Sequence, residues 1–130
     1  MEDSIFTKIV KGEIPSYKIY EDDYTLAFLD IHPVQSGHTL VIPKQQVEFL
    51  WDLDDEIYQR VMATSKKVAN RIKDVIKPSF VGMQVIGVDV AHAHVHLIPF
   101  SSVQEFRKVP NMTEEPDHNS LKETARILAF

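Results

Sequence analysis

The chain has 130 residues, of which 44% are hydrophobic and 25% charged, a composition typical of a folded protein that excludes an intrinsically disordered one. Its net charge of −5 argues against broad binding to nucleic acid, which relies on a basic surface. Cysteine is absent, which excludes disulfides, thiolate metal sites and cysteine nucleophiles.

The first part of the chain predicts a short helix followed by three strands. Ser4 or Asp3 caps the helix and Gly12 ends it. Pro15 then favours an extended path. The expected elements are the helix over 5–11 and strands over 17–21, 24–31 and 38–43.

A long helix is the clearest element of the second part. From about Leu53 to Ile76, apolar residues recur every three to four positions, with Asp52 or Asp54 as N-cap and Lys77-Pro78 as the end. Strands over 79–87 and 92–99 follow, and a last helix runs from about Thr113 towards Phe130. This order indicates an α+β fold with a mostly antiparallel sheet.

Nothing in the sequence indicates a membrane or export segment. The N-terminus lacks a basic start followed by an apolar run, and no apolar segment approaches the roughly 20 residues of a membrane span. We therefore expect a cytoplasmic protein with no membrane partner. We expect one domain over 1–130, with a core over 4–100 and a tail with a helix over 101–130.

Three histidines at alternate positions, His92, His94 and His96, stand out in the segment AHAHVHLIPF. On a strand they would project from one face, with Cα atoms of neighbours about 7 Å apart. A tetrahedral zinc needs every nitrogen within about 2.1 Å, so three histidines on a straight strand do not converge on one ion. A metal site therefore needs a ligand from elsewhere: His32, His38, His118 or a carboxylate. The alternatives are exposed surface residues and a catalytic or anion-binding row of imidazoles.

The segment His92-x-His94-x-His96-Leu97-Ile98 resembles the signature of the histidine triad (HIT) family, in which the histidines alternate with apolar residues. Two further stretches, SIFTKIVKGEIPSYKIYEDD (4–23) and LAFLDIHPVQSGHTLVIPK (26–44), resemble the N-terminal and central segments of that family. The resemblance covers residues 4 to about 99 and points to the Hint-like nucleotide-binding branch.

The resemblance implies a HIT-like fold: a five-stranded antiparallel sheet with a long helix packed on it and helices at both ends. It implies a homodimer whose subunits share a continuous sheet. It also implies binding of a purine nucleotide of the AMP or GMP kind and cleavage at the α-phosphorus of phosphoramidates or related mononucleotide esters or anhydrides, without a cofactor.

The same resemblance assigns roles to individual residues. His94 matches the nucleophile that forms a nucleotidyl-imidazole intermediate, and His92, His96 and His38 match the groups that position the phosphate and assist the leaving group. Asp30 matches the ribose-binding acid. The apolar wall around the base falls on Ile5, Phe6, Ile9, Ile14, Phe28 and Ile31, although such residues also occur simply as core.

Two departures from the family pattern affect these expectations. Many bacterial relatives hold a structural zinc with Cys-x-x-Cys, a histidine after Ile-Pro-Lys and the first triad histidine, but the first three positions here are Ser4, Thr7 and Gln46. We therefore expect a metal-independent protein with His92 free.

The second departure is a shortened phosphate-binding loop, VIGVDVAH (85–92), which leaves Gly87 and Asp89 as the candidate phosphate contacts. Two alternatives to an enzyme remain open: a non-catalytic nucleotide-binding or protein-interaction module, and a metal-binding protein.

Overall fold

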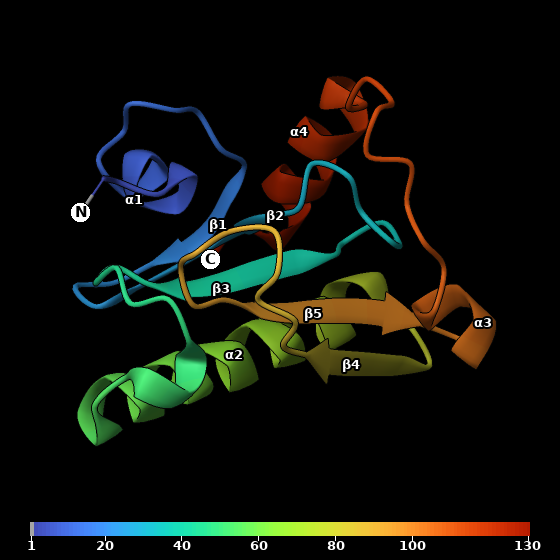
Figure 1. The fold of residues 1–130 in the computed structure, drawn as a ribbon. Coiled ribbons are helices and arrows are strands. Elements are labelled where there is room, and N and C mark those ends of the chain that lie inside the picture. The colour runs from blue at the N-terminus through green and yellow to red at the C-terminus, as the bar shows by residue number, and fades with distance from the viewer. Residues whose placement is uncertain (1) are drawn as a thin grey trace.

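The computed structural model describes residues 2–130; Met1, where the predicted domain begins, lies outside them. Five antiparallel strands form one sheet in the order β1-β2-β3-β5-β4 (Figure 1). This confirms the predicted α+β class and HIT-like architecture. The strands are β1 (Lys18–Glu21), β2 (Thr25–Leu29), β3 (Thr39–Pro43), β4 (Phe80–Gln84) and β5 (Val95–Phe100).

The long helix α2 (Asp55–Ile76) covers one face of the sheet. Asp54 caps it by accepting a hydrogen bond from the Ile57 N–H, and Lys77 ends it in the left-handed region at φ 58°, immediately before Pro78. A 3-10 turn, η1 (Leu50–Asp52), precedes it. The buried stripe of α2 packs on alternate strand residues to form the main core, which includes Val61, Val68, Ile72, Ala27, Leu29, Val41, Val95 and Leu97.

The short helix α1 (Ile5–Val10) lies on the opposite face of the sheet (Figure 1). Ser4 caps it, and Gly12 follows with φ +79°, as expected for a glycine that ends a helix. Phe6 and Ile9 pack on the strand residues that point away from α2, forming a second, smaller core with Leu26, Phe28, Leu40 and Ile42.

Strand β5 begins at Val95, three residues later than predicted. Its pairing with β3 sets Leu40 opposite His96, and the same register would set Ala93 opposite Pro43. Proline has no N–H to donate, so the ladder ends there. The prediction that all three histidines project from one face of a strand is therefore wrong, because only His96 lies in β5.

The tail also differs from the prediction. The last helix, α4 (His118–Leu128), begins five residues later than expected, because Glu115 precedes Pro116 and Asp117 serves as the N-cap. Residues 101–117 form a segment between β5 and α4 that we call the strap, and it contains an unpredicted helix, α3 (Val103–Phe106). Across residues 2–130, no helix is both long enough and apolar enough to cross a membrane.

Candidate active site

A cleft with two chambers lies on the face of the sheet that carries α1. The apolar chamber, about 260 Å³, lies between α1, β2 and the loop that joins β4 to β5. The polar chamber, about 450 Å³, lies between that loop and the strap. The two chambers share a boundary, and five residues there contribute to the walls of both: Asp30, His32, Asp89, His96 and Met112.

All six residues predicted to surround a base line the apolar chamber: Ile5, Phe6, Ile9, Ile14, Phe28 and Ile31. Phe6, Ile9 and Phe28 are buried and also belong to the smaller core, so each both packs in the core and lines the chamber. Ile5 and Ile31 are 49% and 44% exposed, which leaves apolar surface for a flat ligand to cover.

His94 lies on the wall of the apolar chamber with its tautomer fixed by the backbone. Its Nδ1 lies 2.7 Å from the carbonyl oxygen of His92. A carbonyl only accepts, so Nδ1–H is the donor and Nε2 of the neutral ring keeps its lone pair. Phe6 packs edge-on against the ring, with centroids 5.1 Å apart. The arrangement gives the His94 ring the form that a nucleophilic imidazole requires.

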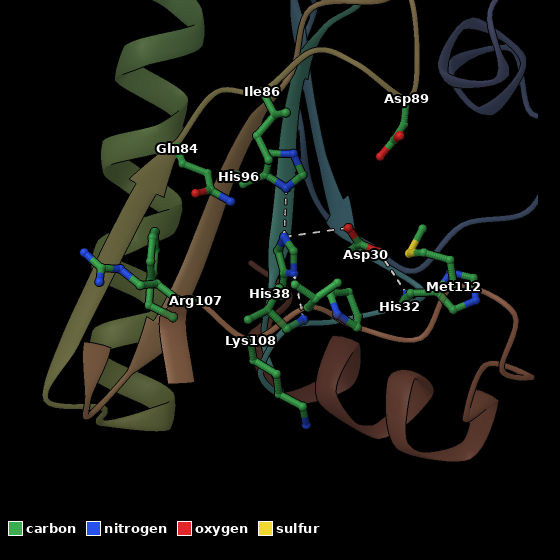
Figure 2. A pocket seen from close by; sticks show the side chains of 14 residues that line it. Asp30, His32, His38, Gln84, Ile86, Asp89, His96, Arg107, Lys108 and Met112 are labelled. Carbon is green, nitrogen blue, oxygen red and sulfur yellow. Dashed lines mark hydrogen bonds and ion pairs between the residues drawn. The ribbon is translucent and has the colours of Figure 1, made fainter. Parts of the chain in front are cut away.

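His38 and His96 form a hydrogen-bonded pair in the polar chamber (Figure 2). The Val34 N–H donates to His38 Nδ1 at 3.0 Å, so the proton of the neutral His38 ring is on Nε2, which donates to His96 Nδ1 at 2.9 Å. His96 in turn carries its proton on Nε2. Burial lowers the pKa of His38 to about 3 and that of His96 to about 4, with further lowering by His96 and His94, respectively. Both rings are therefore neutral near pH 7.

Asp30 follows β2 at the boundary of the two chambers. Its Oδ1 accepts the His32 N–H at 2.9 Å, while Oδ2 lies 3.7 Å from His38 Nε2. Burial raises the pKa of this carboxyl group. Oδ2 lacks a close donor among the described residues, so it remains able to accept hydrogen bonds from a ligand.

His92 lies behind His94, buried and outside both chambers. Its Nε2–H donates to the Pro43 carbonyl at 2.8 Å, and Ser4 Oγ donates to its Nδ1 at 2.8 Å. Protein groups therefore anchor the His92 side chain, and its carbonyl orients His94; that His92 is free of zinc stays a prediction.

The positions that hold zinc in many relatives form a hydrogen-bonded cluster here. Thr7 Oγ1 donates to Gln46 Oε1 at 2.6 Å, and the Ser4 N–H donates to the same oxygen at 2.7 Å. With His92, these side chains satisfy one another. Hydroxyl and amide groups in place of thiolates and an imidazole do not fit a structural zinc ion.

A second group that resembles metal ligands consists of Asp30, His38 and His96, whose ligand atoms lie within 4.8 Å of one another. The tautomers oppose a metal there. His38 Nε2 carries a proton because Nδ1 accepts the Val34 N–H, and His96 Nδ1 accepts that proton in a hydrogen bond. A metal would need both nitrogens as free lone pairs. The geometry favours a hydrogen-bonded pair.

The loop between β4 and β5 contributes less than expected. Gly87 has φ +78° but lines neither chamber, whereas Asp89 lines both. Three polar residues of the polar chamber were not predicted: Gln84, which lies opposite His96 in the β4–β5 register, and Arg107 and Lys108 on the strap (Figure 2). Strand pairing would have identified Gln84, but no sequence pattern identifies the two cations.

Comparisons with known proteins identify the family. Residues 11–103 match the family model of the HIT domain. An uncharacterized HIT-like protein of Borreliella burgdorferi is 45% identical in a match of 106 residues, and the match covers 76% of this chain and 76% of that protein. The adenosine 5′-monophosphoramidase of Saccharomyces cerevisiae is 42% identical over 96 residues, which are 73% of this chain and 61% of the yeast protein.

The fold has close counterparts among solved structures. A HIT-like protein involved in cell-cycle regulation from Bartonella henselae superposes with a TM-score of 0.84 at 31% identity, covering 98% of this chain and 97% of that one. The family match ends at residue 103, so most of the strap lies outside it. This chain belongs to the HIT family.

Proposed function

We propose that this protein is a metal-independent nucleotide hydrolase or transferase that cleaves at the α-phosphorus of purine nucleoside phosphoramidates or related mononucleotide esters or anhydrides. The observation that carries the proposal is the fixed tautomer of His94, which leaves a lone pair on Nε2 of a side chain that lines a chamber suited to a base. The similarity to a yeast adenosine 5′-monophosphoramidase supports the choice of substrate.

The residues divide the work between the two chambers. The apolar chamber takes the base, with Phe6 and Phe28 against its faces and edges. Asp30 Oδ2 accepts hydrogen bonds from the ribose hydroxyls. This places the phosphate at the boundary, next to His94 and His96. The Nε2–H of His96 is the donor available there for a phosphoryl oxygen.

Catalysis then takes two displacement steps. His94 Nε2 attacks the α-phosphorus, forming a P–N bond as the bond to the leaving group breaks. A phosphoramidate nitrogen that is already protonated departs as neutral ammonia with the bonding electron pair. Water then attacks the phosphorus and gives up a proton to the bulk solvent as the P–N bond breaks. This step releases the nucleoside monophosphate and returns the lone pair to His94.

The direct test compares the release of AMP from adenosine 5′-phosphoramidate by the wild type and by His94→Ala. We expect the variant to lose about a thousandfold or more in kcat/KM. His118→Ala is the matched control, because His118 is exposed and lines neither chamber. Equal rates for the wild type and His94→Ala would contradict the proposal. Calorimetry that shows AMP binding without turnover would favour a non-catalytic nucleotide-binding module.

A homodimer is the second part of the proposal. β4 is an outer strand with one unpaired edge, and it carries Phe80 and Met83 at 59% and 45% exposure. A second copy pairing along this edge would extend the sheet. Sedimentation analysis should give a dimer, and a monomer at micromolar concentration would contradict it. The cytoplasmic location and the single domain over 1–130 stay predictions from the sequence.

A further inference from the structure

The strap is anchored on the sheet through Phe106. The Phe106 ring packs so closely on β4 that a Cβ at Gly82 would lie 2.4 Å from its Cε1 atom. Glycine at this position therefore leaves room for the ring. Phe106 also packs against Phe100 on β5, with ring centroids 5.1 Å apart. The two contacts fix the start of the strap over the end of the sheet.

Two hydrogen bonds hold the strap on either side of its central part. Gln35 Nε2 donates to the carbonyl of Glu105 at 3.2 Å, and His32 Nε2–H donates to the carbonyl of Glu114 at 3.1 Å. Between these ties, residues 106–110 and Met112 form a wall of the polar chamber. The strap is therefore held in place as part of the chamber wall.

The strap supplies the positively charged side chains that line the two chambers. Among the described residues that line either chamber, the acids are Asp30 and Asp89, and the only lysine or arginine side chains are Lys108 and Arg107. The paired imidazole of His96 is neutral near pH 7, since its pKa is lowered to about 4. Without the strap, the cleft would present two carboxylates to an anionic substrate, which is unfavourable.

Arg107 and Lys108 are available to a ligand. Within the part of the chain that the structure describes, neither side chain forms an ion pair or a hydrogen bond with another side chain. Figure 2 shows their charged ends pointing away from His38 and His96. Both side chains are long and flexible enough to turn into the chamber when an anion arrives there.

The direction of attack places the departing group on the strap side. His94 lines the apolar chamber and not the polar one. In an in-line displacement the leaving group departs opposite the nucleophile. With the base in the apolar chamber and phosphorus next to His94 and His96, the opposite side is the polar chamber.

We infer that Arg107 and Lys108 are specificity-determining residues for the leaving group, so that the protein favours nucleotides whose leaving group is anionic. This inference rests on the proposed function. The two cations balance Asp30 and Asp89 and add attraction for a negative charge on the departing group. A neutral leaving group lacks this added attraction. The substrate class is a nucleoside phosphoramidate or anhydride with a carboxylate or phosphate on the departing side.

The test uses two adenosine 5′-phosphoramidates that share the same P–N bond, one made from β-alanine and one from propylamine. They differ by one carboxylate on the departing amine. We expect the wild type to favour the β-alanine compound about tenfold in kcat/KM, the effect of one screened charge pairing. The double variant Arg107→Gln/Lys108→Gln should treat the two compounds equally, because it should lose more activity on the β-alanine compound than on the propylamine compound.

The matched control is Lys66→Gln/Lys122→Gln, which removes two exposed lysines on α2 and α4 and gives the same net charge. It should keep the preference. Equal wild-type rates on both compounds, a preference that persists in the Arg107/Lys108 variant, or equal losses on both compounds would each overturn the inference while leaving the proposed function intact. If neither compound shows His94-dependent turnover, the proposed function fails and the inference falls with it.

Discussion

His38 should make the protein sensitive to mild acid. Its ring is 3% exposed, and burial lowers its pKa from the ordinary 6.5 to about 3. The groups that face it are His96 Nδ1 at 2.9 Å and Asp30 Oδ2 at 3.7 Å. Because the unfolded chain binds a proton at His38 more readily than the folded chain does, stability is lost as the pH falls below 6.5 towards 3.

The size of the effect follows from the two pKa values. At pH 5, His38 is mostly protonated in the unfolded chain and mostly neutral in the folded one, so the free energy of unfolding falls by about 2 kcal/mol relative to pH 7. The full difference below pH 3 is about 5 kcal/mol from this one group. This loss is a large part of the stability of a typical domain.

Urea unfolding followed by circular dichroism at pH 7 and pH 5 measures this loss of stability. His38→Asn keeps an acceptor near the Val34 N–H and removes the titrating ring. The difference in the free energy of unfolding between pH 7 and pH 5 should be about 2 kcal/mol smaller in this variant than in the wild type. His118→Asn, an exposed control, should behave as the wild type does. The same pH dependence in His38→Asn and the wild type would refute the reasoning, whatever the absolute stabilities.

Two further predictions concern packing and metal binding. Gly82→Ala should destabilise the protein by about 1–3 kcal/mol in urea unfolding, because its Cβ would displace the Phe106 ring; an unchanged midpoint would show that the strap does not depend on this contact. A variant with the zinc ligands of relatives should bind one zinc per chain by elemental analysis, and chelation should lower its melting temperature. The wild type should bind no zinc, and chelation should leave its melting temperature unchanged. A metal-free variant would mean that the cluster geometry differs from a zinc site. The substitutions are Ser4→Cys, Thr7→Cys and Gln46→His.

Much of the fold could be predicted because local signals agreed with the tertiary structure. Helix α2 shows this best: apolar spacing, the Asp54 cap and the Lys77-Pro78 end all act within the helix itself. The start of β5 could not be read in this way. It depends on Pro43, which is distant in sequence and ends the ladder opposite Ala93. The late start of α4 could have been predicted from the sequence, because Pro116 lies just before the helix and restricts the residue that precedes it.

In the candidate site, too, the features set by local sequence patterns were predicted, and those set by residues distant in sequence were not. The predicted apolar wall lines one chamber, since helix and strand periodicity places those residues on the face of the sheet that carries α1. The buried position of His92 was missed, because its partners are Ser4 and the Pro43 carbonyl. Arg107 and Lys108 were missed for a similar reason. Their place at the polar chamber depends on how the strap folds back, which periodicity does not encode.

The cluster of Ser4, Thr7, Gln46 and His92 changes what the protein requires from its surroundings. A thiolate–zinc anchor depends on metal supply and is open to oxidation and to chelators. Here hydroxyl, amide and imidazole groups hold the same place, and they need no loading step after folding. The histidine whose carbonyl aligns His94 is therefore in position as soon as the chain is folded, and oxidants or a shortage of zinc leave it there.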